Sequence, residues 1–377
     1  MVLMTCQILM IRQVLMDRPF NFSPGPATLP EVVLDEARAE LHNWRNTGVS
    51  VMEMSHRSPH FEAVLTEAKS DLRELLAVPD SHRILFVQAS PTALNAIIPM
   101  NLAQRGERLA PVDFVHTGHF SGRSLKEAEK YTRTNVAASS EPENFTVIPP
   151  QDTWRLSADA AYVHICSNET INGTEYFFTP DAGSVPLVAD MSSHILSRQI
   201  NVSDYGLIFA GAQKNMGIAG VSVVIVREDM TGHALPVCPS VYDFKELVRH
   251  RSIPNTVPVY AIYLCSLVFR WLKNQGGVAA MEQAAVARSA MLYDCIDSSA
   301  LYFNQVDRMC RSRMNVPFFL NDVSLEKAFL AGAEKNGLLN LGGHRSVGGM
   351  RASIYNAMPL AGVEKLVSYM REFERRS

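Results

Sequence analysis

The segment PLVADMSSHILSRQINVSDYGLIFAGAQKNMGIAGVSVVIV, residues 186–226, decides the fold class of this chain of 377 residues. It contains three short runs that are almost wholly apolar, PLVAD, LIFAG and VSVVIV. Runs of this length and composition are typical of strands that are buried on both faces. Because such strands occur mainly in sheets with helices on both sides, the segment predicts a mostly parallel sheet in an α/β protein.

Similar patterns extend on both sides of this segment. Further strands are predicted at ILFVQ (84–88), VDFVH (112–116) and AYVHIC (161–166). Apolar residues at helical spacing predict an amphipathic helix over 60–77, and an apolar helix is expected from about Thr92. The pattern is strongly helical over 257–297, and MNVPFFL (314–320) begins a smaller α+β segment that ends in a helix from about Leu360.

The length corresponds to roughly two to three domains at ~100–200 residues each. We predict a large domain at residues 31–272, which holds the sheet, and a smaller α+β domain formed by residues 1–30 and 273–377. A second methionine, Met16, directly precedes the string DRPFNFSPGP. Residues 1–15 are therefore expected to be an upstream start or a loosely ordered extension.

The composition argues against several classes of protein. Lys and Arg number 35 against 38 Asp and Glu, whereas nucleic-acid-binding proteins usually have a basic excess. The six cysteines form no CxxC pair and show no zinc-ligand spacing, so free thiols in a reducing compartment and no metal are expected. The longest uncharged apolar stretch, Val257–Phe269, is shorter than the ~20 residues of a membrane-spanning helix. We expect a cytoplasmic protein that acts on small molecules, without nucleic acid or membrane partners.

Two residues that follow predicted strands form an informative pair. Asp190 ends PLVAD and Lys214 follows LIFAG, and the carboxyl ends of parallel strands are where ligands bind. Lysine forms a Schiff base with an aldehyde, and an aspartate beside a pyridine nitrogen keeps that nitrogen protonated. Their separation of 24 residues (214 minus 190) predicts one helix-like crossover between neighbouring strands. On spacing alone, a structural buried ion pair between Asp190 and Lys214 remains the alternative.

Seven longer strings are specific in combination. They are NFSPGPATLP (21–30), VMEMSHRS (51–58), SNETINGTE (167–175), VADMSSHILSR (188–198), YGLIFAGAQKNMG (205–217), PNTVP (254–258) and GGHRSVGGMRASIYNAMP (342–359). Together they resemble the phosphoserine aminotransferase family, and the resemblance runs from about Pro19 to the last helix. It implies a fold type I transferase that depends on pyridoxal 5'-phosphate and forms a homodimer with active sites at the subunit interface.

The resemblance also implies a role for individual residues in the cofactor site. Lys214 would be the Schiff-base lysine, and Asp190 would be the partner of the pyridine nitrogen. Thr170, in SNETING, would hydrogen-bond the ring hydroxyl of the cofactor. The residues that would contact the cofactor phosphate are Gln213 and, from the second subunit, Asn255 and Thr256. Uncharged donors and helix N-terminal amides are suited to a phosphate dianion.

Two positions of the cofactor site depart from the family pattern. Where the family usually has a glycine-rich turn for the cofactor phosphate, this chain has Ala89-Ser90-Pro91-Thr92. Proline removes one amide donor, and the hydroxyls of Ser90 and Thr92 would replace it. Where the family usually has a tryptophan stacked on the pyridine ring, this chain has Phe120, which can stack with a smaller area and no indole donor.

Basic residues in two of the strings match family positions that hold the substrate. They are His56 and Arg57 in VMEMSHRS, and His344, Arg345 and Arg351 in GGHRSVGGMRASIYNAMP. An arginine side chain binds carboxylate and phosphate groups through two parallel hydrogen bonds, which makes it suited to a substrate that is anionic at both ends. For His56, a packed loop histidine is an equally good interpretation.

The resemblance implies transamination between 3-phosphohydroxypyruvate with L-glutamate and O-phospho-L-serine with 2-oxoglutarate, in serine biosynthesis. A phosphorylated hydroxythreonine of pyridoxine biosynthesis is a further candidate substrate. Two alternatives stay open from the sequence. One is a related aminotransferase for another anionic oxo acid, such as a dicarboxylate. The other is a protein that binds pyridoxal phosphate but has impaired catalysis because of the altered phosphate turn.

Overall fold

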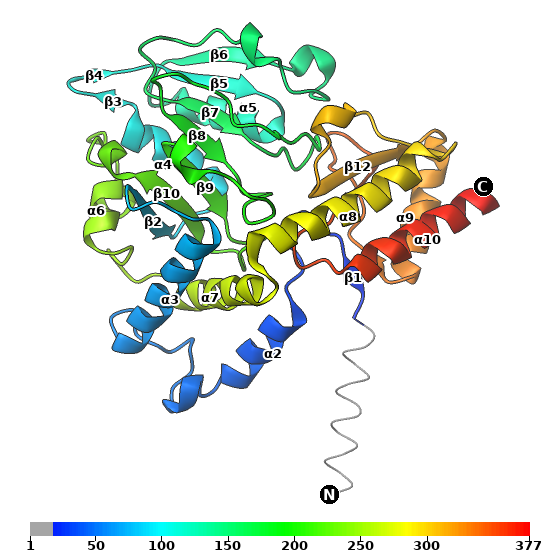
Figure 1. Cartoon of the computed structure of the whole chain (residues 1–377), viewed down its shortest axis with the longest axis horizontal. Coiled ribbons are helices and arrows are strands. Elements are labelled where there is room, and N and C mark those ends of the chain that lie inside the picture. The colour runs from blue at the N-terminus through cyan, green and yellow to red at the C-terminus, as the bar shows by residue number, and fades with distance from the viewer. Residues whose placement is uncertain (1–17) are drawn as a thin grey trace, which may run out of the picture.

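A seven-stranded sheet forms the centre of the computed structural model, which describes residues 18–377; the predicted extension at residues 1–15 lies outside them (Figure 1). The strands are β2 (His82–Val87), β10 (Ser222–Arg227), β9 (Leu207–Gly211), β8 (Leu187–Asp190), β7 (Val163–Cys166), β5 (Val112–His116) and β6 (Thr134–Ser139), in spatial order. Six of these strands run in the same direction, and β10 runs opposite to them between β2 and β9. The predicted mostly parallel α/β sheet is therefore confirmed.

The sheet contains every strand predicted for it and one strand that was not predicted. The observed bounds of β5 and β9 are those predicted, and the others differ by one or two residues at an end. The additional strand, β6, has the sequence TNVAAS and lies at the edge, where only Ala137 is buried. Because most side chains of β6 are partly exposed, unlike those of β2 at the other edge, its apolar pattern is weak.

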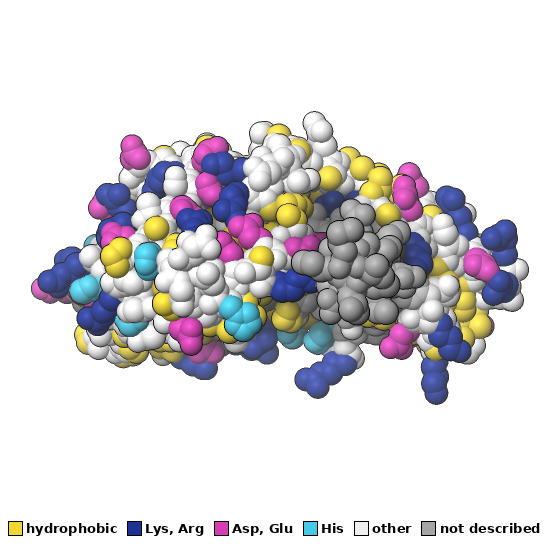
Figure 2. All heavy atoms as spheres, turned by 90° about the horizontal axis from the view of Figure 1, so that it is seen from below, with side chains coloured by type: hydrophobic (Ala, Val, Ile, Leu, Met, Phe, Trp, Pro, Cys, Tyr) yellow, Lys and Arg dark blue, Asp and Glu magenta, His cyan; other side chains and the backbone are white. Residues whose placement is uncertain are grey.

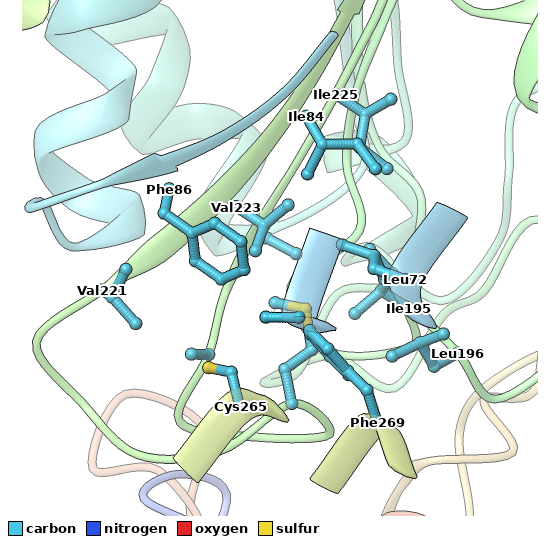
Figure 3. Close-up of a cluster of buried hydrophobic side chains, with 14 of the residues drawn as sticks. Leu72, Ile84, Phe86, Ile195, Leu196, Val221, Val223, Ile225, Cys265 and Phe269 are labelled. Atoms are coloured by element: carbon cyan, nitrogen blue, oxygen red, sulfur yellow. The ribbon is translucent and has the colours of Figure 1, made fainter. Parts of the chain in front are cut away.

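Both faces of the sheet are covered by helices, as the alternation of side chains in β2 illustrates. Ile84 and Phe86 belong to a cluster with α3 (Pro59–Leu75) and α7 (Val259–Asn274), part of which Figure 3 shows. Leu85 and Val87 point to the opposite face and pack with the remaining helices of this part. Those helices are α4 (Pro91–Leu102), α5 (His119–Ala128) and α6 (Phe244–Arg249).

A second hydrophobic cluster joins the C-terminal elements to Phe22, near the N-terminal end of the described residues. It is built around the three-stranded antiparallel sheet of β11 (Tyr302–Phe303), β12 (Asn315–Leu320) and β14 (Met350–Ser353), with helices α9 (Glu326–Lys335) and α10 (Leu360–Arg376). The short strand β1 (Phe20–Asn21) pairs in parallel with β13 (Leu338–Leu339). The division of the chain at residue 272 stays a prediction.

Two helices connect the sheet to the C-terminal elements. The predicted helical region over 257–297 is two helices, because Gly276 has a φ of 96° and ends α7 before α8 (Gly277–Asp297) begins. α8 runs from the large sheet towards the C-terminal elements, and α2 (Glu31–Glu40) lies on the same side of the sheet as α3 and α7 (Figure 1). The remaining strands, β3 (Gln104–Arg105) and β4 (Arg108–Leu109), form a small hairpin.

The connection between β8 and β9 corrects one prediction. It contains turns and a 3-10 helix (Val202–Asp204) but no α-helix, so the helix-like crossover is wrong. Its backbone carbonyls are satisfied by side chains instead: Asn215 donates to the carbonyl of Ile195, and Asn356 donates to that of Leu196. These two hydrogen bonds tie the connection to Asn215, directly after Lys214, and to Asn356 in the loop after β14.

The described residues carry mixed charges. Figure 2 shows basic and acidic side chains interspersed on the face that it presents. Within residues 18–377, no helix has the length and the apolar character needed to cross a membrane. In the same range, no three His, Cys, Asp or Glu side chains are grouped so that they could bind a metal ion.

Candidate active site

Lys214 lies at the carboxyl edge of the sheet, three residues after β9 ends. Its Nζ donates a hydrogen bond of 2.7 Å to Oγ1 of Thr170, which lies in the loop after β7. The same Nζ is 5.5 Å from the centroid of the Phe120 ring at the start of α5. No ion pair between Lys214 and Asp190 occurs among the described residues, so the alternative of a structural buried ion pair is not what the structure contains.

Asp190 is the last residue of β8, and only 6% of it is exposed. Its Oδ1 accepts a hydrogen bond of 2.8 Å from the backbone amide of Ser192. Burial raises the pKa of Asp190, while the hydrogen bonds from Ser192 and the charge of Lys214 act in the opposite direction. A buried carboxylate with so few donors is stabilised when a cationic or proton-donating group lies against it.

Lys214 and Asp190 line a cavity of about 260 Å³ with eight other residues that were predicted for the site. These eight are Ser90, Pro91, Thr92, Phe120, Thr170, Gln213, His344 and Arg351. Among the described lining residues, Asp190 is the only carboxylate, whereas Lys214, Arg123 and Arg351 are cationic. The cavity is therefore suited to an anionic ligand.

The turn after β2 places a helix N-terminus at this cavity. Ser90 caps α4, and its hydroxyl accepts a hydrogen bond of 3.2 Å from the amide of Ala93. Pro91 occupies the first helical position, where an amide has no partner within the helix, so the missing donor does not weaken α4. An added Cβ at Gly211 would lie 2.5 Å from Pro91 and 2.6 Å from Gln213, so this glycine lets the turn approach Gln213 closely.

The segment SPGP near the N-terminus closes another side of the cavity. Gly25 has a φ of 135°, and a Cβ added there would lie 3.3 Å from Cγ of Lys214. The amide of Ala27 donates to the carbonyl of Gln213 at 2.9 Å, and the hydroxyl of Tyr355 donates to the carbonyl of Pro24 at 2.7 Å. The N-terminal segment is thereby held between the large sheet and the C-terminal elements.

Arg351 is the charged residue that the C-terminal sheet contributes to the cavity. It lies in β14, is 6% exposed, and burial lowers its pKa. Its Nε is buried without a hydrogen-bond partner among the described residues. An unpartnered, buried guanidinium that lines a cavity is a binding group for an anion. His344 lies in the loop before β14 and lines the same cavity.

Five predicted site residues do not line this cavity within the single chain. Arg345 is exposed beside His344, and Arg57 is exposed in the turn before α3, where its Nε is 3.3 Å from Nε2 of the half-buried His56. Asn255 and Thr256 are both exposed. Nδ2 of Asn255 lies 3.5 Å from the side chain of Gln88, which follows β2.

The cavity also has lining residues that the sequence analysis did not select. They include Pro24, Gly25, Asn95, His119, Arg123, Cys166, Asn168, Ile171, Ser192 and Ser193. A usable signal existed for four of them, because His119, Asn168, Ser192 and Ser193 come two or three residues after predicted strands. Arg123 is four residues after His119 on α5 and therefore lies on the same helical face. Only the arrangement of α5 shows that this face borders the cavity.

Comparison with known proteins identifies the family. The model of the aminotransferase class-V family matches residues 19–366. The phosphoserine aminotransferase of Herminiimonas arsenicoxydans is 57% identical over 361 residues, which cover 96% of this chain and 99% of that protein. The chain belongs to the phosphoserine aminotransferase family. The phosphoserine aminotransferase of Janthinobacterium sp. (strain Marseille), at 56% identity with the same coverage, is a further relative.

Solved structures of phosphoserine aminotransferases have the same fold. The enzyme from Bacillus circulans subsp. alkalophilus superposes with a TM-score of 0.93 at 43% identity, over 96% of this chain and 99% of that chain. The enzyme from Trichomonas vaginalis, solved with pyridoxal phosphate bound, gives a TM-score of 0.90 at 41% identity, over 94% and 100% of the two chains. The predicted family and the fold type I architecture are therefore confirmed.

Proposed function

We propose that this phosphoserine aminotransferase family member binds pyridoxal 5'-phosphate and interconverts 3-phosphohydroxypyruvate and L-glutamate with O-phospho-L-serine and 2-oxoglutarate, as a step of serine biosynthesis. The observation that carries the proposal is the charge of the cavity. Lys214, Arg123 and Arg351 face it, and Asp190 is its only carboxylate among the described lining residues. Such a lining suits a phosphorylated cofactor together with a substrate that is anionic at both ends.

The residues of the cavity fit pyridoxal phosphate. Asp190, buried with few hydrogen-bond donors, would pair with the pyridine nitrogen, and Thr170 would donate to the ring hydroxyl. Ser90, Thr92 and Gln213 would bind the phosphate at the N-terminus of α4. When bound, the cofactor supplies an aldehyde for amines and an electron sink for the charge left by a departing α-proton.

Lys214 and Asp190 would do the acid–base work. Nζ of Lys214 would hold the cofactor aldehyde in the resting enzyme. Once displaced by the substrate amine, it would take the α-proton from the substrate as a general base and deliver it to the carbon that came from the aldehyde. Thr170 orients this amine through its hydrogen bond, and Phe120 covers one side of it. The carboxylate of Asp190 would keep the proton on the pyridine nitrogen.

Basic residues would orient the substrate. Arg351 would bind one anionic group of the substrate through its unpartnered guanidinium. His344 and Arg345 would bind the other anionic group, and His56 and Arg57 would add to this site. Holding both ends of the substrate fixes its α-carbon against Lys214, which is how such clamps accelerate a reaction.

We also propose that two chains form each active unit and that the enzyme is cytoplasmic. Asn255 and Thr256 are exposed, and in a homodimer they would reach the cofactor phosphate of the partner subunit. Val32 of α2 and Met52 of the loop before α3 are 57% and 58% exposed, which supports an apolar contact of this region with a second copy.

A panel of amino donors and oxo acids tests the proposal. Purified enzyme loaded with pyridoxal phosphate is assayed with O-phospho-L-serine, a phosphorylated hydroxythreonine, aspartate and alanine, each with 2-oxoglutarate. We expect phosphoserine to give the highest kcat/KM of the four amino donors. A higher value for another anionic donor would assign a related aminotransferase reaction. Cofactor binding without transfer to any acceptor would indicate a protein with impaired catalysis.

A further inference from the structure

The rings of two histidines from different parts of the fold face each other at the mouth of the cavity. His119 is the first residue of α5, and His344 lies in the loop before β14. Their ring centroids are 5.5 Å apart and the ring planes are inclined by 50°. Both residues line the cavity that holds Lys214 and Arg351. His119 thus adds a histidine from α5 to the basic residues that line the cavity.

The backbone at the start of α5 is held in place by the half-buried side chain of Asn172 and the buried side chain of Glu169. Its amide donates a hydrogen bond of 3.2 Å to Oδ1 of Asn172. The next two amides, of Phe120 and Ser121, donate to the buried carboxylate of Glu169 at 2.9 and 2.8 Å. Glu169 therefore occupies the amides at the N-terminus of α5, which would otherwise be free to bind an anion. What this end of the helix presents to the cavity is the side chain of His119.

We propose that His119 is a substrate-binding residue which, with His344, binds the distal anionic group of the substrate and favours a phosphate over a carboxylate there. The inference rests on the proposed function, because it concerns the substrate of that site. A phosphate has three terminal oxygens and a second charge, so it can accept hydrogen bonds from two imidazoles and a guanidinium together. A carboxylate has two oxygens and gains less from an additional donor.

The charges around the two rings support this role. Burial lowers the pKa of His119, and the charges of His344, Arg123 and Lys126 lower it further. Burial, Arg351 and Arg345 likewise lower the pKa of His344. Glu169 is the carboxylate packed against this end of α5, and its hydrogen bonds are directed to the helix amides. An anion between the rings would oppose these effects and favour both protonated forms, so phosphate binding should weaken as the pH rises through the lowered pKa values of the two free rings.

The test compares His119→Ala and His119→Gln with the parent, all loaded with pyridoxal phosphate. His233→Ala is the matched control, because His233 is an exposed histidine after β10, whose C-terminal end lies at the opposite edge of the sheet. Single half-reactions give kcat and KM for phosphoserine and for glutamate separately. Inorganic phosphate is titrated calorimetrically into each holoenzyme at pH 6 and pH 8, and the affinity for the cofactor is measured by fluorescence.

His119→Ala should raise the KM for phosphoserine and the Kd for inorganic phosphate about ten- to a hundredfold, as expected for the loss of one hydrogen bond to a charged group. The KM for glutamate should change less than about twofold, and the pH dependence of phosphate binding should become smaller. His119→Gln keeps an N–H donor and should retain part of the affinity for phosphate. His233→Ala should have the KM and Kd values of the parent. The affinity for the cofactor should be the same in all variants.

The outcomes separate this inference from the proposed function. If the parent transfers amino groups from phosphoserine but His119→Ala matches it in KM and phosphate affinity, the role of His119 is wrong. Equal losses for phosphoserine and glutamate would overturn the preference for phosphate. If the parent does not use phosphoserine but loses phosphate affinity on His119→Ala, the function is wrong and the anion-binding role of His119 stands.

Discussion

Nζ of Lys214 donates its hydrogen bond to Oγ1 of Thr170 at 2.7 Å, and Lys214 and Asp190 do not form an ion pair. The lysine and the aspartate therefore line the same cavity without neutralising each other through an ion pair. This arrangement leaves an amine and a buried carboxylate free for a ligand between them. It is the relationship on which the first two predictions depend.

Lys214→Ala should abolish transamination, because Lys214 supplies the only lysine amine among the described lining residues of the cavity. Activity below a few per cent of the parent is expected in a coupled assay with phosphoserine and 2-oxoglutarate. Lys335→Ala, which removes an exposed lysine at the end of α9, is the control and should retain full activity. Substantial turnover by the Lys214 variant would remove its assignment as the reactive amine.

Asp190→Asn should slow proton transfer by orders of magnitude and leave the fold intact. The amide oxygen of asparagine can still accept the hydrogen bond from Ser192, but it carries no charge to hold a proton on the pyridine nitrogen. Rapid mixing of the loaded enzyme with phosphoserine measures the rate of a single turnover. If the variant and the parent react equally fast, Asp190 is only a structural acid.

Arg351→Ala should raise the KM for phosphoserine about ten- to a hundredfold, the cost of roughly 1.5–3 kcal/mol for a lost charged hydrogen bond. Arg351→Lys keeps the charge but not the paired donors, so it should recover only part of the affinity. Arg345→Ala should also raise the KM for phosphoserine. Unchanged kinetics for both alanine variants would mean that the substrate's anionic groups bind elsewhere.

Mixing two inactive variants should restore activity if each site contains residues of both subunits. One variant is Lys214→Ala, and the other carries Asn255→Ala with Thr256→Ala. A mixed dimer would contain one site with all of these residues intact, so about half of the sites in mixed dimers should be active. Absence of recovery, after native mass spectrometry has shown that subunits exchange, would argue that each site is built from one chain.

His164 should make the stability of the fold depend on pH. This residue of β7 is buried between Phe114 and Phe209, and neither ring nitrogen has a hydrogen-bond partner among the described residues. Burial lowers the pKa of His164 to about 3. The unfolded chain, with an ordinary pKa near 6.5, therefore binds a proton that the folded chain does not bind, and stability is lost as the pH falls below about 6.5.

For one such group, the free energy of unfolding falls by about 1.4 kcal/mol per pH unit between pH 6 and pH 4. Urea unfolding of the parent and of His164→Leu at pH 7 and pH 5 measures it. The leucine variant should lose less stability between the two values, while His233→Leu, which changes an exposed histidine, should behave as the parent. Equal slopes for the parent and His164→Leu would show that His164 is protonated in the folded state.

Much of the fold was predictable because the central strands are apolar on both faces. β5 and β9 begin and end where the sequence indicates, and polar residues come soon after each run, Thr117 directly after β5 and Gln213 two residues after β9. β6 was missed because most of its side chains are partly exposed, so it lacks a continuous apolar run. The connection after Asp190 was predicted as a helix, yet Asn215 and Asn356 bind its carbonyls from elsewhere in the chain. A local pattern cannot report such distant partners.

By itself, the sequence determined the sheet, the family and the chemical groups after each strand, including Asp190 and Lys214. These are local properties, because burial on two faces demands apolar runs and the reacting groups occupy short, specific strings. Only the tertiary structure decided that Arg351 lines the cavity, with an Nε that has no partner among the described residues, and that His119 faces His344. These contacts join α5 to a loop and a strand of the C-terminal elements, and packing of the second hydrophobic cluster, rather than any local pattern, sets where those elements lie.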